Sequence, residues 1–239
     1  MAKREYMKVK DLTAAHWQRI EDKARAVLGD TTGLRQSIEE RERVAIYWDA
    51  SDDLVALVTL DMRHETFRGH QVVSIYTGNT WIHPKWRGKN IVQRLAFRSY
   101  AETMIRWPRA RKFWFFGSNS YKSYLVMARN LREFWPTHRR STPSWETDYI
   151  RHLAQQIYHT DVEPGRLVYD PDAARSFSED ETTVPPKLAD DPDVLFFVDR
   201  NPKFARGAKL MCLAPLTMSN WASVARRAAA RAIRRKPRS

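Results

Sequence analysis

Cysteine is almost absent from the sequence. Cys212 is the only cysteine among 239 residues, so no disulfide can form within the chain, and a reducing compartment, the cytoplasm, is the expected location. Cys212 lies in the apolar run "AKLMCLAPLT", where we expect it to be buried in the core. The seven histidines show no spacing typical of a metal site. A nucleophile elbow, a Walker loop and a zinc ribbon are also missing, which removes support for several common chemistries.

Long hydrophobic runs are missing as well. No stretch of about 18 apolar residues occurs, so we expect no membrane-spanning helix. The first residues, "MAKREYMKVKDL", are charged and are not followed by an apolar segment, so we do not interpret them as a secretory signal. Hydrophobic residues make up 43% of the chain, including nine tryptophans and ten phenylalanines, so a bulky aromatic core is expected.

Acidic residues are scarce at one end of the chain and abundant in another part. The formal net charge is +13; residues 221–239 hold seven basic residues and no acid, whereas residues 161–193 hold ten acids and three bases. A basic surface attracts nucleic acid, anionic lipid or the phosphates of a cofactor such as CoA. A solvated basic surface without a partner explains the charge equally well, and the acidic stretch could pair with the basic tail.

The first third of the chain predicts two helices followed by three strands. Apolar residues at helical spacing indicate helices over Asp11–Leu28 and Leu34–Arg41. The runs "RVAIYWDA", "DLVALVTLDMR" and "QVVSIYTGNTWI" are typical of strands, and the turn sequences between them predict an antiparallel meander. Asp61, His64 and Glu65 fall near one of these turns, where solvated side chains are expected.

The centre of the chain predicts a strand–helix–strand crossover. A helix is expected from about Gly88 to Trp107, then the buried strand "RKFWFFGSNS", then a helix over Ser120–Phe134. Residues 137–193 differ in character, with one helix over Ser144–Tyr158 and a long acidic loop. The runs "VLFFVDR" and "AKLMCLAPLT" predict two late strands, and a last helix begins near Ser219.

The segment "WIHPKWRGKNIVQRL" joins the third predicted strand to the helix after it. The first turn of a helix leaves about four backbone N–H groups without partners and has a partial positive charge. A loop that enters a helix directly from a strand can therefore hold a pyrophosphate, and three cations, Lys85, Arg87 and Lys89, surround its single glycine. An ordinary strand-to-helix turn with solvated charges is the alternative interpretation.

This segment resembles the signature V-x-P-x-x-R-G-x-G-x-G-x-x-L of the GNAT acyltransferases, and the order of predicted elements is also similar to theirs. The resemblance implies an α/β fold with a mixed, largely antiparallel sheet, a splayed central parallel pair and flanking helices. It covers about Leu12 to Thr217 and implies a single domain over residues 1–239, with an insertion at 137–193 and a basic C-terminal helix at 218–239.

The resemblance also implies a binding site for acetyl-CoA or another acyl-CoA. The end of the splayed strand would pair with the pantetheine arm, and the backbone after it would hold the pyrophosphate; the residues implied are Ile82, Arg87, Gly88, Lys89, Asn90, Ile91 and Val92. Asn90 and Val92 replace small residues of the signature, and the branched Val92 is the larger departure. A second register, on Lys85, Gly88 and Asn90, would avoid Val92 but would replace the leading Arg or Gln with Lys.

The implied reaction is transfer of an acyl group, most simply acetyl, from the thioester to a primary amine on a small molecule or a protein. Tyr124 is the candidate acid for the departing thiolate, although packing also explains it. Tyr76, with Thr77 and Asn79, lies on the strand that would hold the acyl group and is the second catalytic candidate. Alignment of amine and thioester could supply much of the rate without a base. Alternatives are a donor bound to acyl carrier protein or tRNA, and a binding protein without catalysis.

Overall fold

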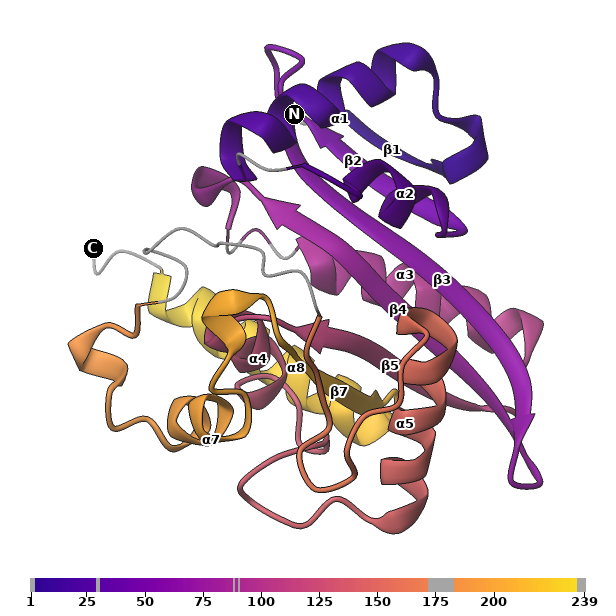
Figure 1. Ribbon diagram of the computed structural model, residues 1–239, viewed down its shortest axis with the longest axis vertical. Coiled ribbons are helices and arrows are strands. Elements are labelled where there is room, and N and C mark those ends of the chain that lie inside the picture. Colours follow the sequence, from indigo (N-terminus) through magenta and orange to yellow (C-terminus); the bar gives the residue numbers. More distant parts are fainter. Residues whose placement is uncertain (1–2, 29–30, 88, 90, 172–182, 236–239) are drawn as a thin grey trace. The chain divides into compact units, whose positions relative to one another are not determined.

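The computed structural model describes residues 3–28, 31–87, 89, 91–171 and 183–235 (Figure 1). The fold is mixed α/β, with a largely antiparallel set of strands and flanking helices, as predicted. The chain divides into two compact units, residues 1–110 and residues 111–239. The parallel pair expected from the resemblance would join the last strand of the first unit to the first strand of the second.

The first unit is a four-stranded antiparallel meander with three helices. Its elements are β1 (Lys3–Lys8), α1 (Ala14–Leu28), α2 (Leu34–Glu39), β2 (Arg43–Trp48), β3 (Leu54–Phe67), β4 (His70–Ile82) and α3 (Ile91–Arg106). Each strand pairs with the next along the chain. The hairpin between β3 and β4 turns at Arg68 and Gly69, both with positive φ, as a tight two-residue turn requires. The predicted meander is therefore confirmed.

Strand β1 was not predicted. Its sequence "KREYMK" is mostly charged, and its burial pattern is exposed to half-buried throughout. It pairs with β2, with Lys3 opposite Trp48 and Lys8 opposite Arg43. An edge strand needs few apolar residues, because one side of it faces solvent and charges there discourage pairing with other chains.

Helices cover both faces of this meander. Apolar side chains of β2 and β3, such as Ile46 and Trp48, pack with Trp17 and Ile20 of α1 and with Ile38 of α2. The opposite face of β2 is held to α3, where two hydrogen bonds join Arg43 to Glu102 at 2.9 and 3.0 Å. In Figure 1, α2 lies in front of the strands and α3 behind them. The alternation of side chains along a strand produces this three-layer arrangement.

The second unit is built around a central strand with antiparallel neighbours on both sides. Its elements are β5 (Arg111–Ser118), α4 (Tyr121–Ala128), α5 (Ser144–Tyr158), β6 (Val168–Tyr169), α7 (Pro192–Arg200), β7 (Lys209–Pro215) and α8 (Met218–Arg235). Strand β7 pairs with β5 and with β6. Helix α5 has the predicted bounds, and Cys212 is buried in β7 as predicted, where burial raises the pKa of its thiol.

The run "VLFFVDR" is a helix, α7, so the prediction of a strand was wrong. The side chain of Asp191 accepts hydrogen bonds from the amides of Asp193 and Val194, at 3.0 and 3.3 Å, and caps the helix. Pro192 occupies the first helical position, where its missing N–H costs nothing. Val194 and Phe197 are buried at a spacing of three residues, as in an amphipathic helix.

Helix α4 is shorter than predicted, ending at Ala128 rather than Phe134. The side chain of Asn130 donates to the carbonyl of Val126 at 2.7 Å. The backbone amides of Arg132 and Glu133 then both donate to one side-chain oxygen of Asn220 in α8, at 2.9 Å each. These hydrogen bonds pair the backbone N–H groups of residues 132 and 133 without a helix. No pattern local to residues 120–134 predicts them, because their acceptor lies in α8.

In the part of the chain that the structure describes, no helix is long and apolar enough to cross a membrane. Over the same residues, no group of three or more His, Cys, Asp or Glu side chains is placed to hold a metal ion.

Candidate functional site

Strand β4 contains a bulge near its end. The register passes from Leu57 opposite Trp81 to Thr59 opposite Gly78, so β4 has one residue more than β3 over this interval. Asn79 lies in the bulge with a φ of 44°, a left-handed conformation that Asn tolerates. A bulge interrupts the hydrogen-bond ladder and bends the strand, so the backbone of β4 is distorted at Asn79, three residues before its end at Ile82.

The side chain of Asn79 holds the bulge to α2. Its amide nitrogen donates to the carbonyl of Ser37 at 3.1 Å, and its oxygen accepts from the Ser37 hydroxyl at 3.2 Å. The same nitrogen is 3.4 Å from the hydroxyl of Thr59 in β3. The side chain of Asn79, which was predicted with Tyr76 on the strand that would hold the acyl group, thus fixes the distorted strand to α2.

Tyr76 lies on the same face of β4 as Gly78 and is 5% exposed. A Cβ atom at position 78 would be 2.4 Å from the Tyr76 hydroxyl oxygen and 2.8 Å from two ring carbons. Glycine at this position therefore allows the tyrosine ring to lie along the strand, with its hydroxyl next to the bulge. Of the two predicted catalytic tyrosines, Tyr76 is the one in the same unit as the strand-to-helix loop.

A buried ion pair between Arg41 and Asp61 lies beside the ring of Tyr76. Arg41 and Asp61 are 8% and 4% exposed, and Nη1 of Arg41 donates to Oδ2 of Asp61 at 3.1 Å. The other oxygen of Asp61 accepts from the amide of Glu42 at 2.6 Å. The Arg41 guanidinium lies 5.2 Å from the centre of the Tyr76 ring. The expectation that Asp61 is solvated was therefore wrong, because its partner lies 20 residues away in the sequence.

Burial opposes the charge on Arg41, but the neighbouring Tyr76 and Asp61 outweigh it and raise the pKa of the guanidinium above its ordinary value. Arg41 is therefore a cation at neutral pH. A permanent positive charge is held beside the aromatic ring of Tyr76.

The loop after β4 begins with a short 3-10 helix, Pro84–Trp86. The amide of Arg87 donates to the carbonyl of Pro84 at 3.1 Å, and the amide of Lys89 is 3.4 Å from the carbonyl of Trp86. The Arg87 side chain also turns back, with Nε donating to the carbonyl of Ile82 at 3.3 Å. The first amides of the predicted phosphate loop are thus already hydrogen-bonded within the loop.

Helix α3 starts directly after this loop, at Ile91, which is buried. Val92 is half-buried as the second helical residue. Lys85 and Lys89 are exposed, and the Lys89 ammonium lies 3.7 Å from the centre of the Trp86 ring. The other two predicted residues, Gly88 and Asn90, lie outside the described part of the chain. The junction combines exposed cations with the start of a 16-residue helix, which is the arrangement that favours an anion.

Tyr124, in the second unit, is fully buried. Its hydroxyl donates to the carbonyl of Pro136 at 3.1 Å, and its ring packs against Phe134 and Phe197. Burial raises the pKa of this phenol well above its ordinary value. Packing accounts for its position, and the role of Tyr124 as an acid stays a prediction.

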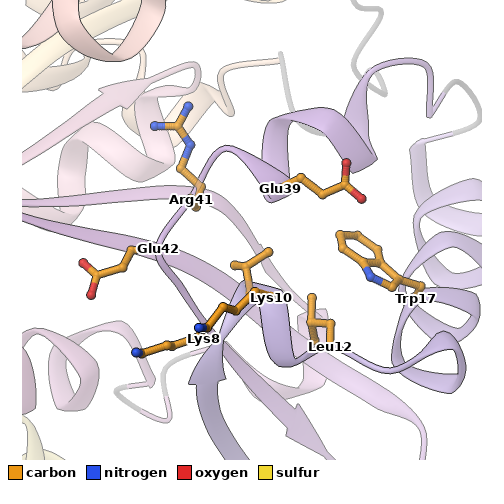
Figure 2. A pocket seen from close by; sticks show the side chains of 8 residues that line it. Lys8, Lys10, Leu12, Trp17, Glu39, Arg41 and Glu42 are labelled. Atoms are coloured by element: carbon orange, nitrogen blue, oxygen red, sulfur yellow. The ribbon is translucent and has the colours of Figure 1, made fainter.

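A hollow of about 540 Å³ lies at the other end of the first unit's sheet (Figure 2). The side chains that line it, together with the buried Val9, are Lys8, Lys10, Leu12, Trp17, Glu39, Arg41 and Glu42. Glu39 pairs with Arg35 and Glu42 with Arg43, each at 3.0 Å. Lys8 and Lys10 have no ion pair among the residues described, so the uncompensated charge at this hollow is positive.

No family model and no curated protein matches the sequence. Solved structures similar to the chain include Escherichia coli ElaA, with 17% identity and a TM-score of 0.37 over 57% of this chain and 88% of that one. An aminoglycoside acetyltransferase from an uncultured soil sample has 9% identity and a TM-score of 0.42 over 60% and 99%. An acyl-CoA N-acyltransferase from Pseudomonas aeruginosa has 12% identity and a TM-score of 0.35 over 48% and 79%. Likeness at this level carries no argument about activity, so the proposal below rests on the residues of the chain itself.

Proposed function

We propose that the protein is an N-acyltransferase that moves an acyl group, most simply acetyl, from acyl-CoA to a primary amine. The observation that supports this most is the junction from Ile82 to Val92. A bulged strand leads through a short turn with exposed cations into the start of a long helix. Partial positive charge at a helix start, together with Lys85 and Lys89, would attract the CoA phosphates.

The backbone amides of Arg87 and Lys89 would not hold the phosphates in this proposal. Because they donate to carbonyls within the loop, the phosphates would be held by the lysine side chains and by the first amides of α3. Ile82, at the end of β4, would lie beside the pantetheine arm. Because the side chain of Val92 is half-buried, it would leave room for the pyrophosphate on the solvent-facing side of the first turn of α3.

The reaction joins the amine nitrogen to the thioester carbonyl carbon and breaks the carbon–sulfur bond. The amine loses a proton to water, and the departing thiolate gains one to give free CoA thiol. We assign the second transfer to the Tyr76 hydroxyl, which lies at the bulge of β4 and belongs to the one tyrosine in that strand. Alignment of the amine and the thioester supplies most of the rate in this proposal.

The test is release of CoA thiol from acetyl-CoA in the presence of small primary amines and a lysine-containing peptide. The proposal predicts release that depends on the amine, with a lower kcat and an unchanged KM for acetyl-CoA in Tyr76→Phe. A melting temperature raised by acetyl-CoA without any thiol release would instead indicate a binding protein without catalysis. Absence of both effects would reject CoA as the ligand.

A further inference from the structure

Helix α8 is anchored at its start. Asn220, 2% exposed, uses its whole side-chain amide there. Its oxygen accepts from the amides of Arg132 and Glu133, and its nitrogen donates to the carbonyls of Glu133 and Pro215, at 2.8 and 2.7 Å. Ser223 is also buried. Four hydrogen bonds to two different segments fix the first turns of α8 within the second unit.

Among the side chains of α8 that the structure describes, Val224 is the last that is not exposed. Every residue from 225 to 230 is exposed, although the helix continues to Arg235 (Figure 1, yellow). A helix without a buried face gains little from tertiary contacts, so its own propensity must maintain it. Alanine and arginine, which dominate this part, are among the best helix formers. The side chains of residues 225–230 therefore lie in solvent, and we call the second half of α8, residues 225–235, the arginine arm.

Charge is concentrated on the arginine arm. Residues 225–235 contain five arginines and no acid. At about 100° per residue, positions 226, 227, 231, 234 and 235 fall within one half of the helix circumference. The other half holds four alanines and Ile233. The positive charge is thus one-sided as well as dense.

This composition distinguishes between two kinds of anionic surface. A helix that lies in a membrane interface needs bulky apolar residues such as Trp, Phe or Leu on its apolar face. The arginine arm has alanines and one isoleucine there, which bury little area. Guanidinium groups, in contrast, bind phosphate oxygens with two parallel hydrogen bonds. We propose that the arginine arm binds the phosphate backbone of a nucleic acid, without dependence on base sequence and independently of the acyl-transfer proposal.

Fluorescence anisotropy of the full chain with a short labelled RNA and a DNA duplex, over a series of salt concentrations, tests this. In Arg226→Gln/Arg227→Gln we expect weaker binding and a shallower salt dependence. Each phosphate contact contributes about 0.7 to the slope of log K against log salt for a single strand, so a loss of about 1.4 is expected. The ratio of RNA to DNA affinity then identifies the source of the phosphates.

Two controls make the result specific. Lys187→Gln/Arg206→Gln removes the same charge from exposed positions of the second unit and should leave the slope unchanged. Arg226→Lys/Arg227→Lys keeps both positive charges and should keep the wild-type slope. A loss of slope in the glutamine variant alone would therefore come from the lost charge and not from a change in the helix. The proposal is overturned by absence of binding, by an equal effect of the Lys187/Arg206 variant, or by stronger binding to phosphatidylserine vesicles than to either nucleic acid. An unchanged slope in Arg226→Gln/Arg227→Gln, as expected if the acidic stretch of the chain occupied the arm, also overturns it.

Discussion

Replacement of Asp61 by Asn should destabilise the first unit strongly. The substitution keeps an oxygen for the amide of Glu42 and removes only the charge that faces Arg41. At 3.1 Å and an effective dielectric constant of 20, the attraction between the two charges is about 5 kcal/mol. Removing one partner of a buried pair typically costs about 3–5 kcal/mol. Arg41 retains a second carboxylate partner, the half-exposed Glu40 at 3.0 Å, so we expect the lower end of that range.

Urea unfolding followed by circular dichroism measures this change. Asp61→Asn should lower the free energy of unfolding by about 3 kcal/mol. The double variant Arg41→Met/Asp61→Asn should lose less than Asp61→Asn alone, because no charge is then left buried without its partner. If Asp61→Asn stays within about 1 kcal/mol of the wild type, the value typical of an exposed pair, or if the double variant is the less stable one, the pair is not buried as described.

Three further predictions concern local contacts. Burial raises the pKa of Glu102, but hydrogen bonds from Arg43 and Arg106 outweigh it and leave the pKa below its ordinary value of 4.5. Glu102→Gln should therefore be less stable than the wild type at neutral pH, and this difference in stability should shrink as the pH falls through the lowered pKa. A difference that persists in acid would contradict this. Asp191→Ala should cost about 1 kcal/mol through loss of the α7 cap, and Asp191→Asn should keep most of it in thermal melts; equal losses in the two variants would count against the cap. Gly78→Ala should cost about 1–3 kcal/mol by collision with Tyr76, and much less in a Tyr76→Ala background; equal costs in both backgrounds would remove the collision as the cause.

The sequence predicted those elements whose signals are local. Runs of strand-forming residues separated by turn sequences identified the meander from β2 to β4, and the predicted helix over Ser144–Tyr158 has the bounds of α5. The run "VLFFVDR" failed because a short apolar run fits a buried strand and a buried helix equally well. The cap at Asp191 and the proline after it were the signals that separate the two, and both are visible in the sequence.

The candidate site was predictable in place but not in detail. The pattern from Ile82 to Val92 located a strand end, a turn and a helix start, and the structure has all three. The bond between Asn79 and Ser37 joins residues 42 positions apart, and the pair of Arg41 with Asp61 joins residues 20 apart. Such contacts depend on how α2 packs on the strands, which no local pattern specifies. Sequence reasoning therefore located the strand-to-helix junction and missed the polar network beside Tyr76.

Calorimetric titration with acetyl-CoA tests the central claim most directly. The wild type should bind one acetyl-CoA per chain. Lys85→Glu/Lys89→Glu should weaken binding by roughly a hundredfold or more, because two charge-assisted contacts, each worth about 1.5–3 kcal/mol, are lost together. Lys187→Glu/Arg206→Glu, with the same change of charge at exposed sites of the second unit, should bind as the wild type does. Equal affinity in all three proteins, or no binding by the wild type, would contradict the assignment of the junction as the CoA site.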